Sequence, residues 1–326
     1  MDINKIIIVF LILLALVIVF FALKPCKKEG FFYWRTTPLY ASGTFSLQSA
    51  IFMAQLSNLA YYAGTPNQNI IQSFMNSKGL KFNPADNIFT YLNTDTAFIW
   101  ATDTQNKSLY ISFRGTVLNE DNLKTDLYQT LVPFQPTSNL NVSVSYGFNQ
   151  AWLGIRSDVF KLISSIQPDN IFLTGHSLGA ALATLCAFDM KYHEHQIIYN
   201  TVIYTFGSPR VGDIAFATNY NKMVSGSNRV QNIYDPVPRF PTEYQGYLHV
   251  NDEVLIDKNM CEINAPAPTN YVADILQHPI SVYISLIQGL MSSNTQCIKS
   301  LKFPRTMSHC TGGNTIPPYG YNVCLY

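Results

Sequence analysis

The chain has 326 residues, of which 48% are hydrophobic, 13% aromatic and 13% charged. Its 21 basic residues face 20 acidic residues, so the formal net charge is +1. Proteins that bind nucleic acid normally carry a basic face, so this composition excludes a nucleic-acid partner. The length suits one α/β enzyme domain, and the apolar content is sufficient for a large core.

The first predicted element is a membrane anchor over Ile6–Leu23, a run without a polar side chain. As a helix rising ~1.5 Å per residue, this run would span roughly 27 Å, close to the hydrocarbon thickness of a bilayer. The apolar region of a signal peptide is usually shorter, about 7–15 residues, and a small-x-small cleavage site follows it. The sequence Phe21-Ala-Leu-Lys-Pro-Cys26 is a poor cleavage site. We therefore expect a single-pass N-terminal transmembrane helix, with secretion after signal-peptide cleavage as the alternative.

The sequence gives conflicting indications of the side of the membrane on which the enzyme would lie. More lysines follow the apolar run than precede it, which favours a cytosolic enzyme. Asn106 and Asn141 lie in glycosylation sequons, and cysteines crowd the C-terminal part, which together favour a lumenal or extracellular side. Cys186 lies in an apolar helical pattern and is predicted to be a buried thiol. The other cysteines are odd in number, so they cannot all pair; they are Cys26, Cys261, Cys297, Cys310 and Cys324.

Beyond a short charged linker at residues 24–30, apolar runs alternate with helical patterns. This alternation is typical of a mostly parallel sheet with helices on both faces. Apolar residues at helical spacing predict a first helix over residues 46–62. Strands are predicted over residues 97–102, 109–113, 171–173, 202–206, 229–234 and 247–256. We divide the chain into an anchor with its linker (1–30), an α/β domain (31–295) and a cysteine-containing tail (296–326).

Gly175, Ser177 and Gly179 form a Gly-x-Ser-x-Gly pattern between an apolar run and an alanine-rich helical pattern. A serine on a sharp strand-to-helix turn projects its Oγ above the sheet, and glycines must flank it because the turn is cramped. The dipole of the following helix points to the place where an oxyanion forms. The pattern alone is common by chance, but in this context it predicts Ser177 as a catalytic nucleophile.

The segment GHSLGAALA around Ser177 resembles the nucleophile elbow of the class 3 lipases. This family contains fungal triacylglycerol lipases and plant and animal phospholipase A1 or diacylglycerol lipase-like enzymes. Further segments similar to the family follow its order, at residues 111–116, 146–148, 205–212 and 230–238. The resemblance extends from about Ser46 to about Leu290. It implies an α/β-hydrolase fold in which residues 31–295 are a lipase domain that needs no metal or organic cofactor.

Asp235 is predicted to be the catalytic acid. A serine hydroxyl needs a neighbouring base, and that base needs an orienting carboxylate. In α/β-hydrolases these residues follow in the order Ser, Asp or Glu, His. Asp235 ends an apolar strand pattern, and Pro236 and Pro238 follow it. An Asp before Pro is also frequent in ordinary turns, but the resemblance favours the catalytic role.

The catalytic base is predicted to be His278, with His249 as the second choice. His278 precedes Pro279 at the start of a helical pattern, which resembles the family's histidine loop before its last helix. His249 lies in a strand-like run, where the resemblance implies a structural Leu-His pair. His309 lies in the tail, outside the resemblance. Chain order excludes the three earlier histidines, which are His176, His193 and His195.

The oxyanion hole is predicted to use the backbone N–H groups of Thr116 and Leu178, one upstream and one directly after the serine. Arg114 is expected to be a structural ion-pair partner, and Gly207 to shape the loop beside the site. Residues 117–134 stand where family members carry a lid. Leu131, Val132 and Phe134 could face lipid there, although ordinary loop hydrophobicity explains them nearly as well.

We predict a serine lipase that hydrolyses acyl esters of glycerolipids, either triacylglycerol or diacylglycerol, through an acyl-enzyme. A phospholipase A1-type hydrolase is the alternative, and a non-catalytic lipid-binding relative is the next rival. A metallohydrolase is disfavoured because the chain has no His-x-x-x-His or Cys-x-x-Cys spacing. A peptidase or thioesterase on the same scaffold could use the same residues, but the resemblance disfavours both. The expected partners are a lipid ester substrate and the membrane, and we expect a monomer.

Overall fold

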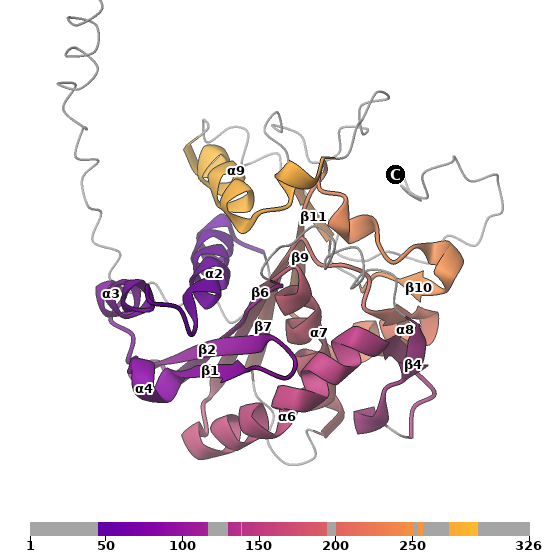
Figure 1. Cartoon of the computed structure of the whole chain (residues 1–326), viewed down its shortest axis with the longest axis horizontal. Coiled ribbons are helices and arrows are strands. Elements are labelled where there is room, and N and C mark those ends of the chain that lie inside the picture. Colours follow the sequence, from indigo (N-terminus) through magenta and orange to yellow (C-terminus); the bar gives the residue numbers. More distant parts are fainter. Residues whose placement is uncertain are drawn as a thin grey trace, which may run out of the picture. The chain divides into compact units, whose positions relative to one another are not determined.

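A central sheet separates two layers of helices in the computed structural model, which describes residues 45–116, 130–137, 139–193, 200–250, 253–256 and 274–292 (Figure 1). In this part of the chain, the strand order is β1-β2-β3-β6-β7-β9-β11. β1, β2 and β3 pair antiparallel, and the remaining neighbours pair in parallel. The strands are Ile88–Tyr91, Thr96–Asp103, Ser108–Phe113, Asn170–His176, Asn200–Phe206, Ser227–Asn232 and Glu253–Ile256.

The central strands are buried on both faces. Every residue of β3 and β9 is buried, and so is every residue of β6 and β7 after the first. Strands of a sheet that is covered on both faces favour unbroken apolar runs over strict alternation. This explains why β3, β6 and β7 appear in the sequence as mainly apolar runs. The predicted mostly parallel sheet is confirmed, as are the strands predicted over 97–102, 109–113, 171–173 and 202–206.

A smaller antiparallel sheet, which we did not predict, has the order β10-β8-β5-β4. The single strand predicted over 247–256 is wrong, because Tyr247 pairs with Asp213 of the small sheet while Glu253 pairs with Arg229 of the central sheet. Strands of two or three residues show too little alternation to be recognised. The strands of the small sheet are Tyr247–Leu248 (β10), Gly212–Asp213 (β8), Ser143–Ser145 (β5) and Leu131–Pro133 (β4).

Helices pack on both faces of the central sheet (Figure 1). α6, α7 and α8 contribute to the core on one face, and α2, α3 and α9 to the core on the other. α2 contacts both β6 and α9, which is why apolar residues surround most of it. It is capped by Ser46, whose Oγ accepts the Ser49 N–H at 3.0 Å, and it confirms the predicted first helix. The helices are Leu47–Leu59 (α2), Asn69–Ser77 (α3), Tyr146–Ile166 (α6), Leu178–His193 (α7), Ile214–Met223 (α8) and Ile280–Ser292 (α9).

Shorter helical turns connect these elements and carry several site residues. They are Pro84–Asn87 (α4) and the 3-10 turns Ala60–Tyr62 (η1), Gln135–Thr137 (η2), Val237–Arg239 (η3), Glu243–Gln245 (η4) and Ile275–Gln277 (η5).

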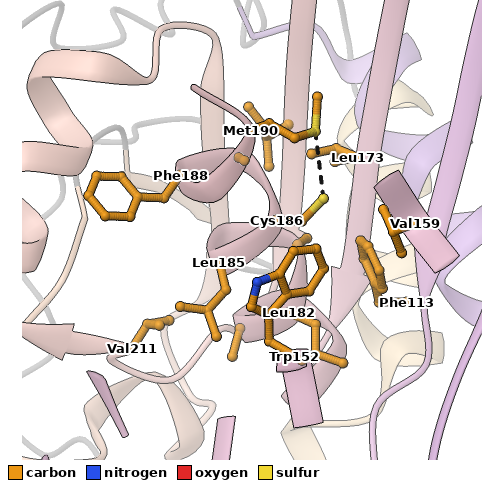
Figure 2. Close-up of a cluster of buried hydrophobic side chains, with 14 of the residues drawn as sticks. Phe113, Trp152, Val159, Leu173, Leu182, Leu185, Cys186, Phe188, Met190 and Val211 are labelled. Carbon is orange, nitrogen blue, oxygen red and sulfur yellow. Dashed lines mark hydrogen bonds between the residues drawn. The ribbon is translucent and has the colours of Figure 1, made fainter. Parts of the chain in front are cut away.

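The predicted anchor over residues 6–23, its linker and the tail after residue 295 lie outside the described residues, so the division into 1–30, 31–295 and 296–326 stays a prediction. Within the part that the structure describes, no helix is both long enough and apolar enough to span a membrane. Cys186 is the cysteine that the structure does describe. It is buried and free, with its Sγ 3.7 Å from Met190 Sδ, which confirms the predicted buried thiol (Figure 2).

The core between α6, α7 and the sheet is organised around Trp152 (Figure 2). Its indole lies edge-on to Phe113 of β3, with ring centroids 6.3 Å apart. The indole N–H donates to Asp189 Oδ2 of α7 at 2.8 Å, and the Arg156 guanidinium donates to both oxygens of that carboxylate. Asp189 is fully buried, so these donors compensate for the water it has lost. The carboxylate therefore ties α6 to the C-terminal half of α7, the helix that begins after the predicted nucleophile.

Replacing this carboxylate tests the tie between the two helices. We expect Asp189→Leu to lower the free energy of unfolding by about 3 kcal/mol, because it leaves the Arg156 guanidinium and the Trp152 N–H without their acceptor. Asp169→Leu is the matched control, since its ion pair with Lys107 is solvent-exposed and should contribute about 0.5 kcal/mol or less. Urea unfolding measures both, and equal losses would contradict the proposed tie.

Candidate active site

Ser177 occupies a sharp turn between β6 and α7. Its φ of +58° is left-handed, a conformation that costs a non-glycine residue about 1–3 kcal/mol and must be held by its surroundings. The Ser177 N–H donates to Phe206 O at 3.0 Å. A Cβ at Gly175 would collide with the Gly179 carbonyl, and a Cβ at Gly179 would collide with the Phe113 carbonyl. Both predicted glycines are therefore required, because a neighbouring backbone leaves no room for a Cβ at either position.

The structure brings Asp235 and His278 together. His278 Nδ1 lies 2.8 Å from Asp235 Oδ2, and neither side chain is exposed to solvent. An ionised carboxylate can only accept, so Nδ1 carries the proton and donates it to the hydrogen bond. The other ring nitrogen, Nε2, is buried and has no hydrogen-bond partner among the described residues. An unprotonated Nε2 is the atom that a general base would use.

Two further groups fix the Asp235 carboxylate. Tyr283 Oη donates to Oδ2 at 2.6 Å, and the Val237 N–H donates to Oδ1 at 2.9 Å. Gly207, with a φ of +56°, leaves room for this cluster, because a Cβ there would lie 2.8 Å from Asp235 Oδ2 and 3.2 Å from His278 Cε1. Our sequence reasoning placed Gly207 beside the site but missed Tyr283, because an aromatic residue at helical spacing indicates core packing.

His176, the residue before the serine, contacts the His278 segment. Its Nε2 lies 2.7 Å from the His278 carbonyl oxygen, its Nδ1 lies 2.7 Å from Tyr61 Oη, and its ring centroid is 4.4 Å from that of His278. Burial first, and the neighbouring His278 next, lower the pKa of His176 well below 6.5. The ring is therefore neutral at physiological pH. Sequence order excluded His176 as the base but did not reveal these contacts.

His249 is separated from Asp235 by its own partners. Its Nε2 lies 2.6 Å from the Pro238 carbonyl oxygen. Burial, followed by Arg229 and Arg210, lowers its pKa well below 6.5. The structure thus places His278, and not His249, against Asp235. The remaining histidines are His193, which is exposed and contacts the Pro136 carbonyl, and His195 and His309, which lie outside the described residues.

Thr116 and Leu178, the residues predicted to form the oxyanion hole, lie just after the end of β3 and at the start of α7. Thr116 follows β3 by three residues, and Leu178 begins α7 directly after Ser177. Both line one cavity of about 210 Å³. Its other lining residues are Thr94, Asp95, Gly147, Phe148 and Ala151.

Arg114 is the structural ion-pair partner that we predicted. Its guanidinium donates to Asp95 Oδ1 at 2.6 Å and to the Asp95 carbonyl at 2.8 Å, which connects the loop after β3 to the turn between β1 and β2. This pair holds the segment that leads into Thr116.

The interpretation of Phe134 as lipid-facing is wrong. Its side chain is 1% exposed and packs against Phe188 and Phe216, because the chain turns into the core after β4. Leu131 and Val132 are partly buried in β4, and residues 117–129 of the expected lid lie outside the described residues. Over the described ranges, no group of three or more His, Cys, Asp or Glu side chains is arranged to hold a metal ion.

Comparison with known proteins gives consistent matches. The family model described as Lipase (class 3) matches residues 110–245. Secreted mono- and diacylglycerol lipase A of Penicillium cyclopium is 33% identical over 167 residues, which are 50% of this chain and 52% of that protein. The Rhizomucor miehei lipase propeptide complex has a TM-score of 0.55 at 27% identity, covering 65% of this chain and 70% of that chain. A solved triacylglycerol lipase described as having a serine protease triad as its catalytic centre has a TM-score of 0.60 at 25% identity, covering 71% and 92%.

These matches confirm the expected resemblance to class 3 lipases and the α/β-hydrolase fold of the described part of the chain. The chain spans about half the length of the curated relatives it matches. The segment matched by the family model contains Thr116, Ser177 and Asp235, and it ends before His278.

The lowered pKa values of His176 and His249 make stability depend on pH. Below about pH 6.5 the unfolded chain binds protons that the folded chain does not, so stability present above this pH is lost as the pH falls. Each such histidine contributes up to about 1.4 kcal/mol per pH unit to the slope. We expect His249→Gln to lose stability less steeply than the wild type between about pH 6.5 and 5, measured by urea unfolding. Equal slopes would contradict the lowered pKa of His249 in the folded protein.

Proposed function

We propose, from the membership of residues 110–245 in the class 3 lipase family, that this protein hydrolyses acyl esters of glycerolipids through an acyl-Ser177 intermediate. One observation carries the proposal. The buried Asp235–His278 couple leaves Nε2 of His278 without a partner among the described residues, and His176, directly before Ser177, packs its ring against His278. Acyl transfer requires a serine, a base and an orienting carboxylate. The Asp235–His278 couple supplies the last two, and His176 connects it to the segment that carries Ser177.

The first half of the reaction acylates the enzyme. Ser177 Oγ attacks the ester carbonyl carbon while His278 Nε2 accepts the hydroxyl proton, and Asp235 stabilises the imidazolium that forms. The N–H groups of Thr116 and Leu178 donate to the oxyanion of the tetrahedral intermediate. Collapse of this intermediate breaks the bond to the alcohol oxygen, which receives the proton from His278. The alcohol leaves, and the acyl group stays on Ser177.

The second half repeats these steps with water. His278 accepts a proton from water as the water oxygen attacks the acyl-enzyme carbonyl, and the same N–H groups hold the second oxyanion. Collapse returns the proton to Ser177 Oγ and releases a fatty acid. No metal or organic cofactor takes part in this scheme.

Neutral acylglycerols are the proposed substrates. The relatives named above include a mono- and diacylglycerol lipase and a triacylglycerol lipase, which supports the carboxylic ester hydrolase class and this substrate class. The cavity beside the proposed oxyanion residues supports it further, since none of its lining residues is basic and its carboxylate, that of Asp95, already pairs with Arg114. Such a lining does not favour a phosphate group.

The location of the enzyme is also a proposal. The apolar run over residues 6–23 would either anchor the enzyme at a membrane or be removed as a signal peptide. The name of the Penicillium relative describes a secreted protein, which supports the second alternative. N-terminal sequencing of the mature protein distinguishes the two.

Substitution of two of the three proposed catalytic residues, Ser177 and His278, tests the mechanism. We expect Ser177→Ala and His278→Ala to lower kcat for p-nitrophenyl butyrate by about 10⁴-fold or more, because each removes a group that the others act through. His249→Ala is the matched control and should retain most of the activity, since its ring contacts the Pro238 carbonyl instead. Loss of activity in His249→Ala with retention in His278→Ala would reverse the base assignment. A folded wild-type protein that neither hydrolyses esters nor reacts with a fluorophosphonate would contradict the proposed function.

The substrate class has its own test. We expect the full-length protein to hydrolyse dioctanoylglycerol faster than dioctanoylphosphatidylcholine, because none of the residues that line the cavity is basic. Fatty-acid release from both lipids, at equal concentration, measures the preference. Faster release from the phospholipid would favour the phospholipase A1-type alternative.

A further inference from the structure

A tyrosine from the first helical segment touches several parts of the proposed active site. Tyr61 lies in η1, directly after α2, and its hydroxyl is 2.7 Å from His176 Nδ1. The same hydroxyl lies against Gly115, because a Cβ on that glycine would collide with it. Gly115 precedes Thr116, and His176 precedes Ser177. The Tyr61 hydroxyl therefore stands between the oxyanion loop and the nucleophile elbow.

The chemistry of the partners fixes the direction of both hydrogen bonds on His176. The His278 carbonyl oxygen can only accept, so the His176 Nε2 facing it at 2.7 Å must carry the hydrogen. In a neutral ring the other nitrogen, Nδ1, is then an acceptor, and the Tyr61 hydroxyl must donate to it. Burial raises the pKa of Tyr61, so its phenol keeps this proton. The His278 carbonyl thus sets the tautomer of His176, and the Tyr61 hydroxyl holds the ring from its other side by donating to Nδ1.

The neighbours of His176 also favour a neutral ring. Its ring faces the rings of His278 at 4.4 Å, Tyr61 at 5.9 Å and Tyr283 at 5.9 Å between centroids. The nearby guanidinium of Arg114 acts electrostatically on Tyr61. His278 becomes a cation during acyl transfer, and a second cation at ring-contact distance would oppose that step.

We propose that Tyr61 and His176 form a positioning pair, in which the Tyr61 hydroxyl orients His176 so that its Nε2–H holds the His278 carbonyl and keeps the base aligned with Ser177. This inference rests on the proposed function, because it assigns the pair a role in the same reaction. Neither side chain exchanges a proton with substrate. The pair acts through the position of His278, where a displacement of about 1 Å can cost a hundredfold in rate.

The pair is tested by measuring the kinetics of full-chain variants that lack either the Tyr61 hydroxyl or the His176 ring. With p-nitrophenyl butyrate, Tyr61→Phe should lower kcat about tenfold and His176→Leu about a hundredfold, with KM within about twofold of the wild type. His176→Gln should recover most of the loss, because its amide can donate to the His278 carbonyl. The double variant Tyr61→Phe/His176→Leu should be no slower than His176→Leu, because Tyr61 acts through His176.

Tyr204→Phe is the matched control for loss of a buried tyrosine hydroxyl. Tyr204 Oη accepts the Ser46 N–H at 3.0 Å, and its ring packs in the core on the α2 face. This variant should lose thermal stability and keep the wild-type kcat. The positioning role is overturned if Tyr61→Phe keeps the wild-type kcat, if the losses of Tyr61→Phe and His176→Leu multiply in the double variant, or if His176→Gln is as slow as His176→Leu.

The same experiment distinguishes a wrong assignment of the positioning pair from a wrong assignment of the proposed function. An active, fluorophosphonate-reactive wild type whose Tyr61 and His176 variants keep its kcat overturns the pair alone. A folded wild type that shows neither turnover nor probe reaction overturns the proposed function and the pair with it.

Discussion

The buried hydrogen bond between Asp235 and His278 imposes the strictest condition on this fold. A carboxylate without solvent access is costly unless donors replace its water, and Asp235 has donors from His278, Tyr283 and the Val237 backbone. These donors come from the residue after η5, from α9 and from η3, so the end of β9 and the start of α9 must converge on one point. Gly207 makes the convergence possible, since a side chain there would occupy the same space.

The same convergence explains why the strained turn at Ser177 survives. A left-handed serine is unfavourable by itself, and its backbone is held by the Phe206 carbonyl on the neighbouring strand. Gly179 lies against the Phe113 carbonyl, so α7 starts at the closest approach that the backbone allows. Further along α7, Asp189 ties this helix to α6. The strain at the turn is thus supported by its contacts with the buried strands β7 and β3.

The parts of this site that could be predicted are those with a local pattern. The elbow around Ser177, the strand before it and the Pro after His278 each follow from neighbouring residues, and the central strands follow from their apolar runs. The pairing of Tyr61 with His176 joins residues 115 apart, and the one between Tyr283 and Asp235 joins residues 48 apart, so no local signal marks either. Phe134 and the small sheet were missed for a related reason, because short segments take their burial from distant partners.

The charges of the site follow from the reaction that we propose for it. Acyl transfer creates one cation on His278 and one oxyanion near Thr116 and Leu178, and both are stabilised only if no competing charge lies between them. His176 is held neutral by burial and by His278 itself, while burial keeps Tyr61 protonated. Arg114, the nearby permanent cation, is paired with Asp95. Asp235 is then left as the carboxylate that contacts His278, so the imidazolium would have a single counter-charge, at Nδ1, while Nε2 is left for the proton transfer that we propose.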